Sequence, residues 1–113
     1  MVYNYNAEIE NLLAPLKVPY AYMFYEGQED TYITYMQISK DTALAGDDKV
    51  IGCVMYYDID IFSKGNYLTL EQDIITLFEG AGWTYQPSRE SPDMYEKDTK
   101  YFHKTICFAK ETI

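Results

Sequence analysis

Hydrophobic residues recur at helical spacing in two segments of this chain. In "NAEIENLLAPL" the apolar side chains lie three or four residues apart and the run ends near Pro15, which predicts a short helix at about residues 6–14. In "YLTLEQDIITLFEGAGW", one helical face collects Leu70, Ile74, Leu77, Phe78 and Ala81. Gly82 follows where a helix C-terminus favours a positive φ, so the second helix is expected to end there.

Extended segments fill most of the remaining chain. Residues 18–25 and 30–39 are rich in β-forming residues, and the Gly-containing "EGQED" between them predicts a hairpin. The polar stretch "KDTALAGDDK" predicts a protruding loop at residues 40–49. "VIGCVMYYDIDIFS" is the longest predicted strand, and "WTYQPSRE" and "KYFHKTICFAKE" close the chain as two more. Pro87 and Pro92 confine the region between these last two strands to an edge or a loop.

The order of predicted elements is helix, three strands, helix, two strands. Short links between neighbouring strands favour antiparallel pairing. We therefore expect an α+β fold in which two helices pack on one face of a mostly antiparallel sheet of about five strands. The length of 113 residues is that of one domain, spanning 1–113, with one hydrophobic core.

Alternation along the longest strand separates a core face from a second face. The core phase is apolar throughout and holds Ile51, Cys53, Met55, Tyr57, Ile59 and Ile61. Together with the second helix and the last strand, it predicts a core that contains Ile59, Ile61, Ile74, Phe78, Ile106 and Phe108. Cys53 is accordingly expected to be a buried, inert thiol.

Asp58 and Asp60 share the opposite phase, about 7 Å apart at two strand rises. A pair of carboxylates at this separation could serve acid–base chemistry or bind a metal. A catalytic pair needs surroundings that separate the two pKa values, and no neighbouring residue in the sequence supplies such a pocket. We therefore interpret the two aspartates as a solvated strand face, which replacement of both by Asn would leave nearly unchanged in stability.

The sheet face away from the helices is predicted to be rich in aromatic residues. Tyr22, Tyr32, Met36 and Tyr56 supply more apolar surface than two short helices can cover. Exposed aromatic patches often mark interfaces, so another subunit is expected to cover part of this face. The alternative is that the loop at 39–49 folds over it. Asp47 and Asp48 in that loop are further candidates for partner contacts.

Composition and charge exclude several classes of partner. The formal net charge is −9, and the 9 basic residues are scattered, which argues against direct binding to nucleic acid and to an anionic membrane. No apolar run approaches the roughly 20 residues of a membrane span. The N-terminus has no basic region typical of a signal peptide, so a cytoplasmic site of synthesis with free thiols at Cys53 and Cys107 is expected.

The inventory of reactive side chains predicts no catalytic site, no metal and no cofactor. His103 is the only histidine, and no serine or cysteine motif accompanies it. The two cysteines are not a CxxC pair and cannot supply four zinc ligands. "GAGW" follows a helix, whereas phosphate-binding glycine loops precede one.

Three stretches together resemble a known family. They are "VPYAYMFYEGQEDTYITYMQIS", "DIDIFSKGNYLTLEQDIITLFEGAGW" and "YEKDTKYFHKTICF", which span residues 18–108. They are similar to the small tail-completion, or tail-terminator, proteins encoded by phages and prophages of Gram-positive bacteria. The junction "DIDIFSKGNY" and the late pattern "YEKDTKYFHK" carry most of the likeness.

The resemblance implies a structural role without enzymatic activity. Proteins of this family have helices on an antiparallel sheet and assemble as rings, commonly hexamers, at the head-proximal end of a long tail tube. The expected partners are therefore copies of the chain itself, the tail tube protein and the head-connector protein. The expected location is the virion, after assembly in the host cytoplasm.

Two other hypotheses remain open. The chain could be a small cytosolic adaptor that binds a peptide or protein through its Tyr-rich sheet face. An enzyme built on Asp58 and Asp60 is the least favoured of the three.

Overall fold

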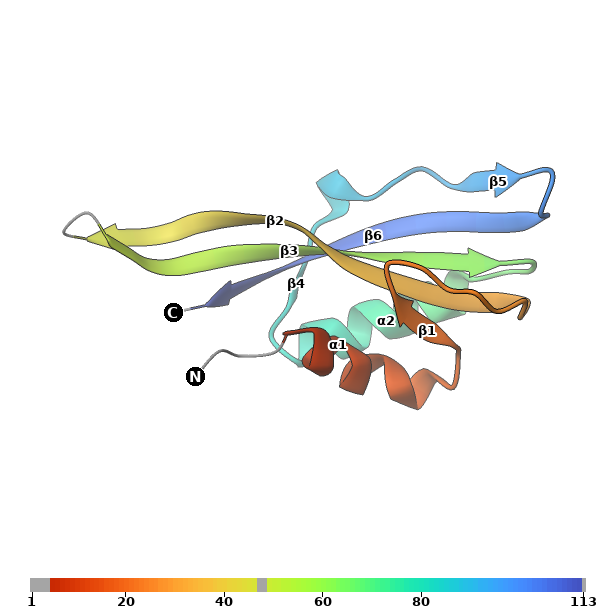
Figure 1. The fold of residues 1–113 in the computed structure, drawn as a ribbon, viewed down its shortest axis with the longest axis horizontal. Helices are drawn as coiled ribbons and strands as arrows, with labels where there is room; N and C mark the ends of the chain where they lie inside the picture. The colour runs from red at the N-terminus through yellow and green to blue at the C-terminus, as the bar shows by residue number, and fades with distance from the viewer. Residues whose placement is uncertain (1–4, 47–48, 113) are drawn as a thin grey trace.

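The computed structural model describes residues 5–46 and 49–112. Within them a mixed sheet of six strands carries two helices on one face (Figure 1). The elements are α1 (Tyr5–Leu13), β1 (Tyr20–Tyr22), β2 (Thr31–Gly46), β3 (Lys49–Ser63), α2 (Leu68–Gly80), β4 (Thr84–Tyr85), β5 (Met94–Glu96) and β6 (Tyr101–Thr112), with short 3-10 turns at Ala14–Leu16 and Pro87–Arg89. The predicted α+β class, with both helices on one face, is confirmed.

Strand β3 is the centre of the sheet. The spatial order is β1-β2-β3-β6-β4, and β5 also pairs with β6. β3 pairs antiparallel with β2 from Ser63 to Lys49 and with β6 from Ser63 to Cys53. Because β3 lies between the two longest partners, its alternation fixes which side chains of the whole sheet face the helices.

The core lies between this sheet and the two helices. The six residues predicted for it are all fully buried: Ile59, Ile61, Ile74, Phe78, Ile106 and Phe108. Ile9 and Leu13 of α1 add to it from the first helix. The rings of Phe78 and Phe108 stack with their centroids 4.5 Å apart, which joins α2 directly to β6.

Gly82 ends the second helix as predicted. Its φ of 91° is a left-handed conformation that only glycine adopts without strain, and Trp83 N then donates to the carbonyl of Phe78. The turn places the Trp83 ring in the core, where it contacts Tyr57 edge-on at a centroid distance of 5.6 Å.

The hairpin predicted between residues 18–25 and 30–39 is wrong, because β1 runs parallel to β2. Met23, with φ 65°, turns the chain at the end of β1, and residues 23–30 run back to the start of β2 (Figure 1). The glycine in "EGQED" therefore lies in this return segment and does not join two adjacent strands. Local β propensity identified both strands but could not give their relative direction.

The loop predicted at residues 40–49 is also wrong in the part that the structure describes. β2 continues to Gly46 and β3 begins at Lys49, so the two strands form one long hairpin. Its polar composition does not distinguish a loop from the end of a long strand pair, which explains why it looked like a loop. Asp47 and Asp48 lie outside the described residues.

Two further expectations need correction. The last part of the chain holds three strands, β4, β5 and β6, where two were predicted, since residues 84–96 follow the outer edge of β6 in two short pieces. Cys53 has the predicted core phase but is only half-buried. It lies beyond the part of β3 that the helices cover, so its side chain points to the predicted face but is not fully buried there.

The packing predicts the effect of truncating Phe78. A Phe78→Ala variant should lower the free energy of unfolding by roughly 3 to 5 kcal/mol, because it removes a fully buried ring and leaves a cavity against Phe108. Chemical denaturation measures this change. Thr76→Ala, at an exposed position of the same helix, is the matched control and should stay within about 0.5 kcal/mol of the parent. A cost below about 1 kcal/mol for Phe78→Ala would contradict this packing.

Candidate functional site

The face of the sheet opposite the helices, called here the open face, holds three of the four apolar residues predicted for it. Tyr32, Met36 and Tyr56 share the phase of Asp58 and are half-buried. Tyr22 does not belong to this face. It pairs with Tyr35 in register, and the two rings meet edge-on at 5.5 Å on the helix side of the sheet. The register of β1 with β2, which the sequence did not reveal, decides this difference.

Aromatic rings stack along one end of the open face. Tyr32 stacks on Phe62 with centroids 4.7 Å apart, and Phe62 stacks on His103 at 4.1 Å. Tyr25, from the return segment 23–30, lies 4.9 Å from Tyr32. The rings bury one another across β2, β3 and β6, so the chain itself covers part of the aromatic surface that was expected to need a partner.

The segment that covers this end is 23–30, and not the predicted loop at 39–49. The hydroxyl of Tyr101 donates to the carbonyl oxygen of Glu29 at 2.6 Å. Lys64 N donates to the carbonyl of Asp30 at 2.8 Å. These bonds fix the end of the return segment against the tips of β3 and β6.

Asp60 is not a solvated carboxylate. His103 Nε2 lies 3.0 Å from Asp60 Oδ1, and the Thr105 hydroxyl donates to the same oxygen. The Asp60 side chain is 18% exposed and that of His103 is 21% exposed. The prediction that both aspartates are solvated surface is therefore wrong, because both are half-buried. For Asp60, β6 also supplies hydrogen-bond partners that lie far away in the sequence.

Asp58 occupies a different environment. Burial and the neighbouring charge of Asp60 raise its pKa, while a hydrogen bond with Cys107 and the charge of Arg89 oppose that rise. Burial raises the pKa of the Cys107 thiol to about 11. At neutral pH this thiol is protonated and fully buried, so it is a poor nucleophile.

Arg89 lies close enough to Asp58 and Cys107 for its charge to lower the pKa of both. Its guanidinium carbon lies 4.0 Å from the centroid of the Tyr56 ring. The polar residues of the open face thus pair with one another, and the contacts of Asp60 with His103 and Thr105 link β3 to β6. Among the residues that the structure describes, no three His, Cys, Asp or Glu side chains gather as a metal site.

A charge cluster around the buried Lys104 was missed by sequence reasoning. Lys104 is only 8% exposed, and its Nζ lies 3.4 Å from Glu90 Oε1 and 3.7 Å from Asp93 Oδ1. The hydroxyls of Tyr85 and Tyr67 donate to the carboxylates of Glu90 and Asp93 respectively. The sequence contained an indication of this cluster, because Lys104 alternates onto the same face of β6 as the core residue Ile106. A lysine on a buried face needs carboxylates nearby to pair with its charge.

Glu71 lies at the edge of this cluster and is 9% exposed. Burial raises its pKa, and the charge of Lys104 only partly offsets that rise. The cluster joins α2 to the segment that leads into β5, so its charges position the outer edge of the sheet.

Exposed apolar side chains form two groups that the sequence did not predict as such. In the described part of the chain, the large exposed ones are Tyr22, Met23, Phe24, Ile38, Leu68, Met94, Tyr95 and Phe102. The first four lie on β1, the turn after it, and β2; the last four lie at the start of α2, on β5 and on β6. They therefore mark opposite edges of the sheet.

The hydrogen bonds of Asp60 predict that replacing Asp60 lowers the free energy of unfolding more than replacing Asp58 does. Asp60→Ala should lower the free energy of unfolding by about 1–3 kcal/mol, because it leaves the half-buried His103 and Thr105 without their shared acceptor. Asp58→Ala is the matched control and should cost less, since it also removes a partly desolvated charge. Equal and small effects in urea denaturation would restore the interpretation of both as solvated surface.

Burial of Glu71 predicts a pH-dependent effect. Its raised pKa means that the folded state holds this proton more tightly than the unfolded chain. The stability that protonated Glu71 contributes is fully present below 4.5, the ordinary pKa of a glutamate, and is lost as the pH rises through the raised pKa of the folded state. Glu71→Gln should therefore raise the melting temperature at neutral pH, with the gain disappearing as the pH falls toward 4.5. Glu79→Gln, at an exposed position of the same helix, should show no such trend. A less stable Glu71→Gln protein at neutral pH would mean that attraction to Lys104 outweighs burial.

No helix within residues 5–46 and 49–112 is long and apolar enough to cross a membrane. A scan against protein-family models finds no match to this chain. A search of curated proteins likewise finds no significant match. The function is therefore inferred from the residues of this chain and their arrangement.

Proposed function

We propose that this protein is a structural subunit of a phage tail that closes the head-proximal end of the tail tube as a ring and helps to join the tail to the head. The starting point is the resemblance of residues 18–108 to tail-completion proteins. The observation that carries the proposal is a projecting arm, which comprises residues 43–46 of β2 and 49–52 of β3 in the described part of the chain. A ring of six subunits follows the commonest state in that family.

The arm is an extension without a local packing partner. β6 pairs with β3 only as far as Cys53, so residues 49–52 of β3 pair with β2 alone in the part that the structure describes. The molecule is correspondingly long, with extents of 53 × 25 × 24 Å, and Figure 1 places the arm beyond both helices. A two-stranded ribbon is marginally stable by itself in water, so contact with a neighbouring molecule would stabilise it.

The outer edge of β2 adds a second feature suited to assembly. β1 pairs with β2 only at residues 33–35, and no other described strand covers that edge. Unpaired edges offer backbone donors and acceptors to another chain. An arm with a free edge fits a subunit that contacts the tail tube protein or the head-connector protein.

The proposal includes no catalytic step and no cofactor. Asp60 is engaged by His103 and Thr105, and Cys107 is a buried thiol of raised pKa. The net charge of −9 disfavours direct contact with DNA, so the subunit is proposed to act through protein surfaces only.

The same exposed surfaces would also serve a cytosolic adaptor, which is the second candidate function. Mutual stacking of Tyr32 and Phe62 reduces the free aromatic surface that an adaptor would use on the open face. Gene position separates the two candidates. A gene between those for the head connector and the major tail proteins favours the tail role, and an isolated gene favours the adaptor.

Deleting the gene from the phage or prophage that encodes it tests the tail role. We expect tails of uncontrolled length without attached heads, and the wild-type protein supplied in trans should restore normal particles. Electron microscopy of purified particles measures both features. Normal tails with heads in the deletion strain would contradict the proposal.

A shortened arm tests the observation behind the proposal. Thr42 pairs with Cys53, so an Asn-Gly turn can replace residues 43–52 with little change to the body. This variant should unfold cooperatively as the parent does but fail to restore the deletion strain. A variant with Thr76→Ala on the exposed face of α2 is the control and should restore it. Full restoration by the shortened protein would show that the arm has no part in the function.

A further inference from the structure

The two groups of exposed apolar side chains lie at the two edges of the same sheet. One group, called here the β1-edge surface, comprises Tyr22, Met23, Phe24 and Ile38. The other, the β5-edge surface, comprises Leu68, Met94, Tyr95 and Phe102. β1 and β5 are separated by β2, β3 and β6, so the strands that carry the two surfaces lie on opposite edges of the sheet, and only the end of the return segment 23–30 reaches the tips of β3 and β6.

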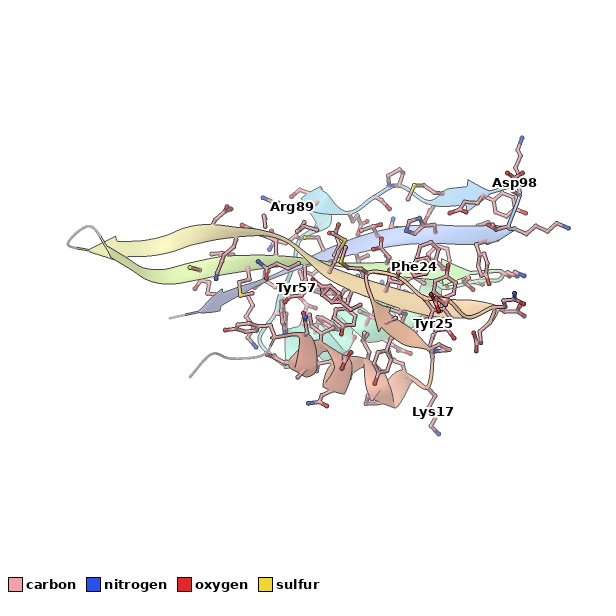
Figure 2. The ribbon with its side chains drawn as sticks, viewed as in Figure 1. Lys17, Phe24, Tyr25, Tyr57, Arg89 and Asp98 are labelled. Carbon is pink, nitrogen blue, oxygen red and sulfur yellow. The ribbon has the colours of Figure 1, made fainter. Side chains whose placement is uncertain are left out.

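A constrained turn presents the β1-edge surface. Phe24 is 70% exposed (Figure 2). Met23 just before it has a left-handed backbone, with φ 65°, which is unfavourable for a residue other than glycine. Met23 N donates to the carbonyl of Tyr35 at 2.9 Å, and Phe24 N donates to that of Tyr22 at 2.7 Å. The backbone that carries the exposed ring is therefore held in place by hydrogen bonds.

The β5-edge surface is hollowed. One hollow is lined by Lys64, Tyr95, Lys100 and Phe102. The rings of Tyr95 and Phe102 lie 4.8 Å apart, and Phe102 also lines a neighbouring hollow beside Leu68. Asp93 lines that second hollow, where its carboxylate is already bonded to Tyr67. A ring such as that of Phe24 matches the apolar lining of these hollows.

Charges around the two surfaces are complementary. The return segment beside Phe24 carries Glu26, Glu29 and Asp30 and no basic residue. Lys64 and Lys100 line the hollow on the opposite edge. Within one molecule the end of this segment already lies beside Lys64, whose N donates to the carbonyl of Asp30, and the Glu29 carboxylate accepts from the Tyr25 hydroxyl. Glu26 is exposed and lies two residues after Phe24. In a chain with a net charge of −9, two lysines beside an exposed apolar hollow favour an acidic partner segment, and Phe24 with Glu26 of another copy has that chemistry.

We propose that the β1-edge surface of one copy binds the β5-edge surface of the next, with Phe24 placed against Tyr95 and Phe102. The contact joins two different surfaces, so each copy can bind two neighbours head to tail, which is the geometry that closes into rings. The inference rests on the proposed function, because the ring is the form in which the protein would act. It adds which surfaces form the contact between subunits.

Single charged substitutions test the contact in the full-length protein. Phe24→Asp blocks one surface, Tyr95→Asp blocks the other, and Thr76→Asp on the exposed face of α2 is the control. Mass is measured by light scattering over a concentration series, in enough salt to screen repulsion between the acidic chains. The wild type and the Thr76→Asp protein should form species larger than a monomer. Each blocked variant should associate at least roughly tenfold more weakly, as expected when a central aromatic contact is lost.

Mixing the two blocked variants distinguishes a head-to-tail contact from a symmetric one. Phe24→Asp keeps an intact β5-edge surface and Tyr95→Asp keeps an intact β1-edge surface. Together they should form a dimer and no larger species, although neither forms one alone. Association of either variant alone at wild-type strength would overturn the proposal, as would a wild type that stays monomeric throughout. Circular dichroism spectra that match the wild type confirm that the variants fold.

The outcome can be separated from that of the tail proposal. If the chain forms these contacts but the deletion strain makes normal tails, the surfaces are correct and the tail role is wrong. If the gene is required for normal tails and both blocked variants restore them, the tail role stands and the contact proposed here is wrong.

Discussion

Burial of one face of β3 beneath both helices is the constraint on which the rest of the structure depends. Ile59 and Ile61 are fully buried there, and their neighbours Ile33 and Ile106 in register on β2 and β6 are buried with them. Each such side chain contributes about 1.5–3 kcal/mol when it leaves water. A slip of one residue would expose this row and bury Asp58 and Asp60 in its place, so the register is strongly specified.

The open face follows from the same register. Once Ile59 and Ile61 point to the helices, Asp58, Asp60 and Phe62 must point away from them. On β6, His103 and Thr105 provide hydrogen-bond partners for Asp60, and the His103 ring also stacks on Phe62. The open face therefore has polar and aromatic packing of its own. Both faces are thus packed at this end of β3, and the large apolar side chains that stay exposed in the described residues lie at the edges of the sheet.

The edges are where the alternation is interrupted. Ile38 is an extra residue between two pairs of the β2–β3 ladder, and the arm begins farther along, where β6 stops pairing with β3 at Cys53. On the other side, β4 and β5 are separated by the turn at Pro87–Arg89, and the buried charge of Lys104 positions that segment. The apolar side chains that remain exposed gather at these two interrupted edges. This distribution suits a protein that acts by contacting other subunits.

The sequence by itself determined the two helices, the core phase of β3 and the six core residues, because each depends on a periodicity that can be counted along the chain. Tertiary structure alone decided the direction of β1, since β propensity allows three residues to pair in either direction. It also decided that residues 40–46 continue β2, because the polar composition of this stretch suits both a loop and the end of a long strand. The partners of Asp60 lie more than forty residues away, at His103 and Thr105, and only the register between β3 and β6 brings them within hydrogen-bond distance. The two exposed edge surfaces likewise collect residues from separate elements, so no local pattern could indicate that they are neighbours.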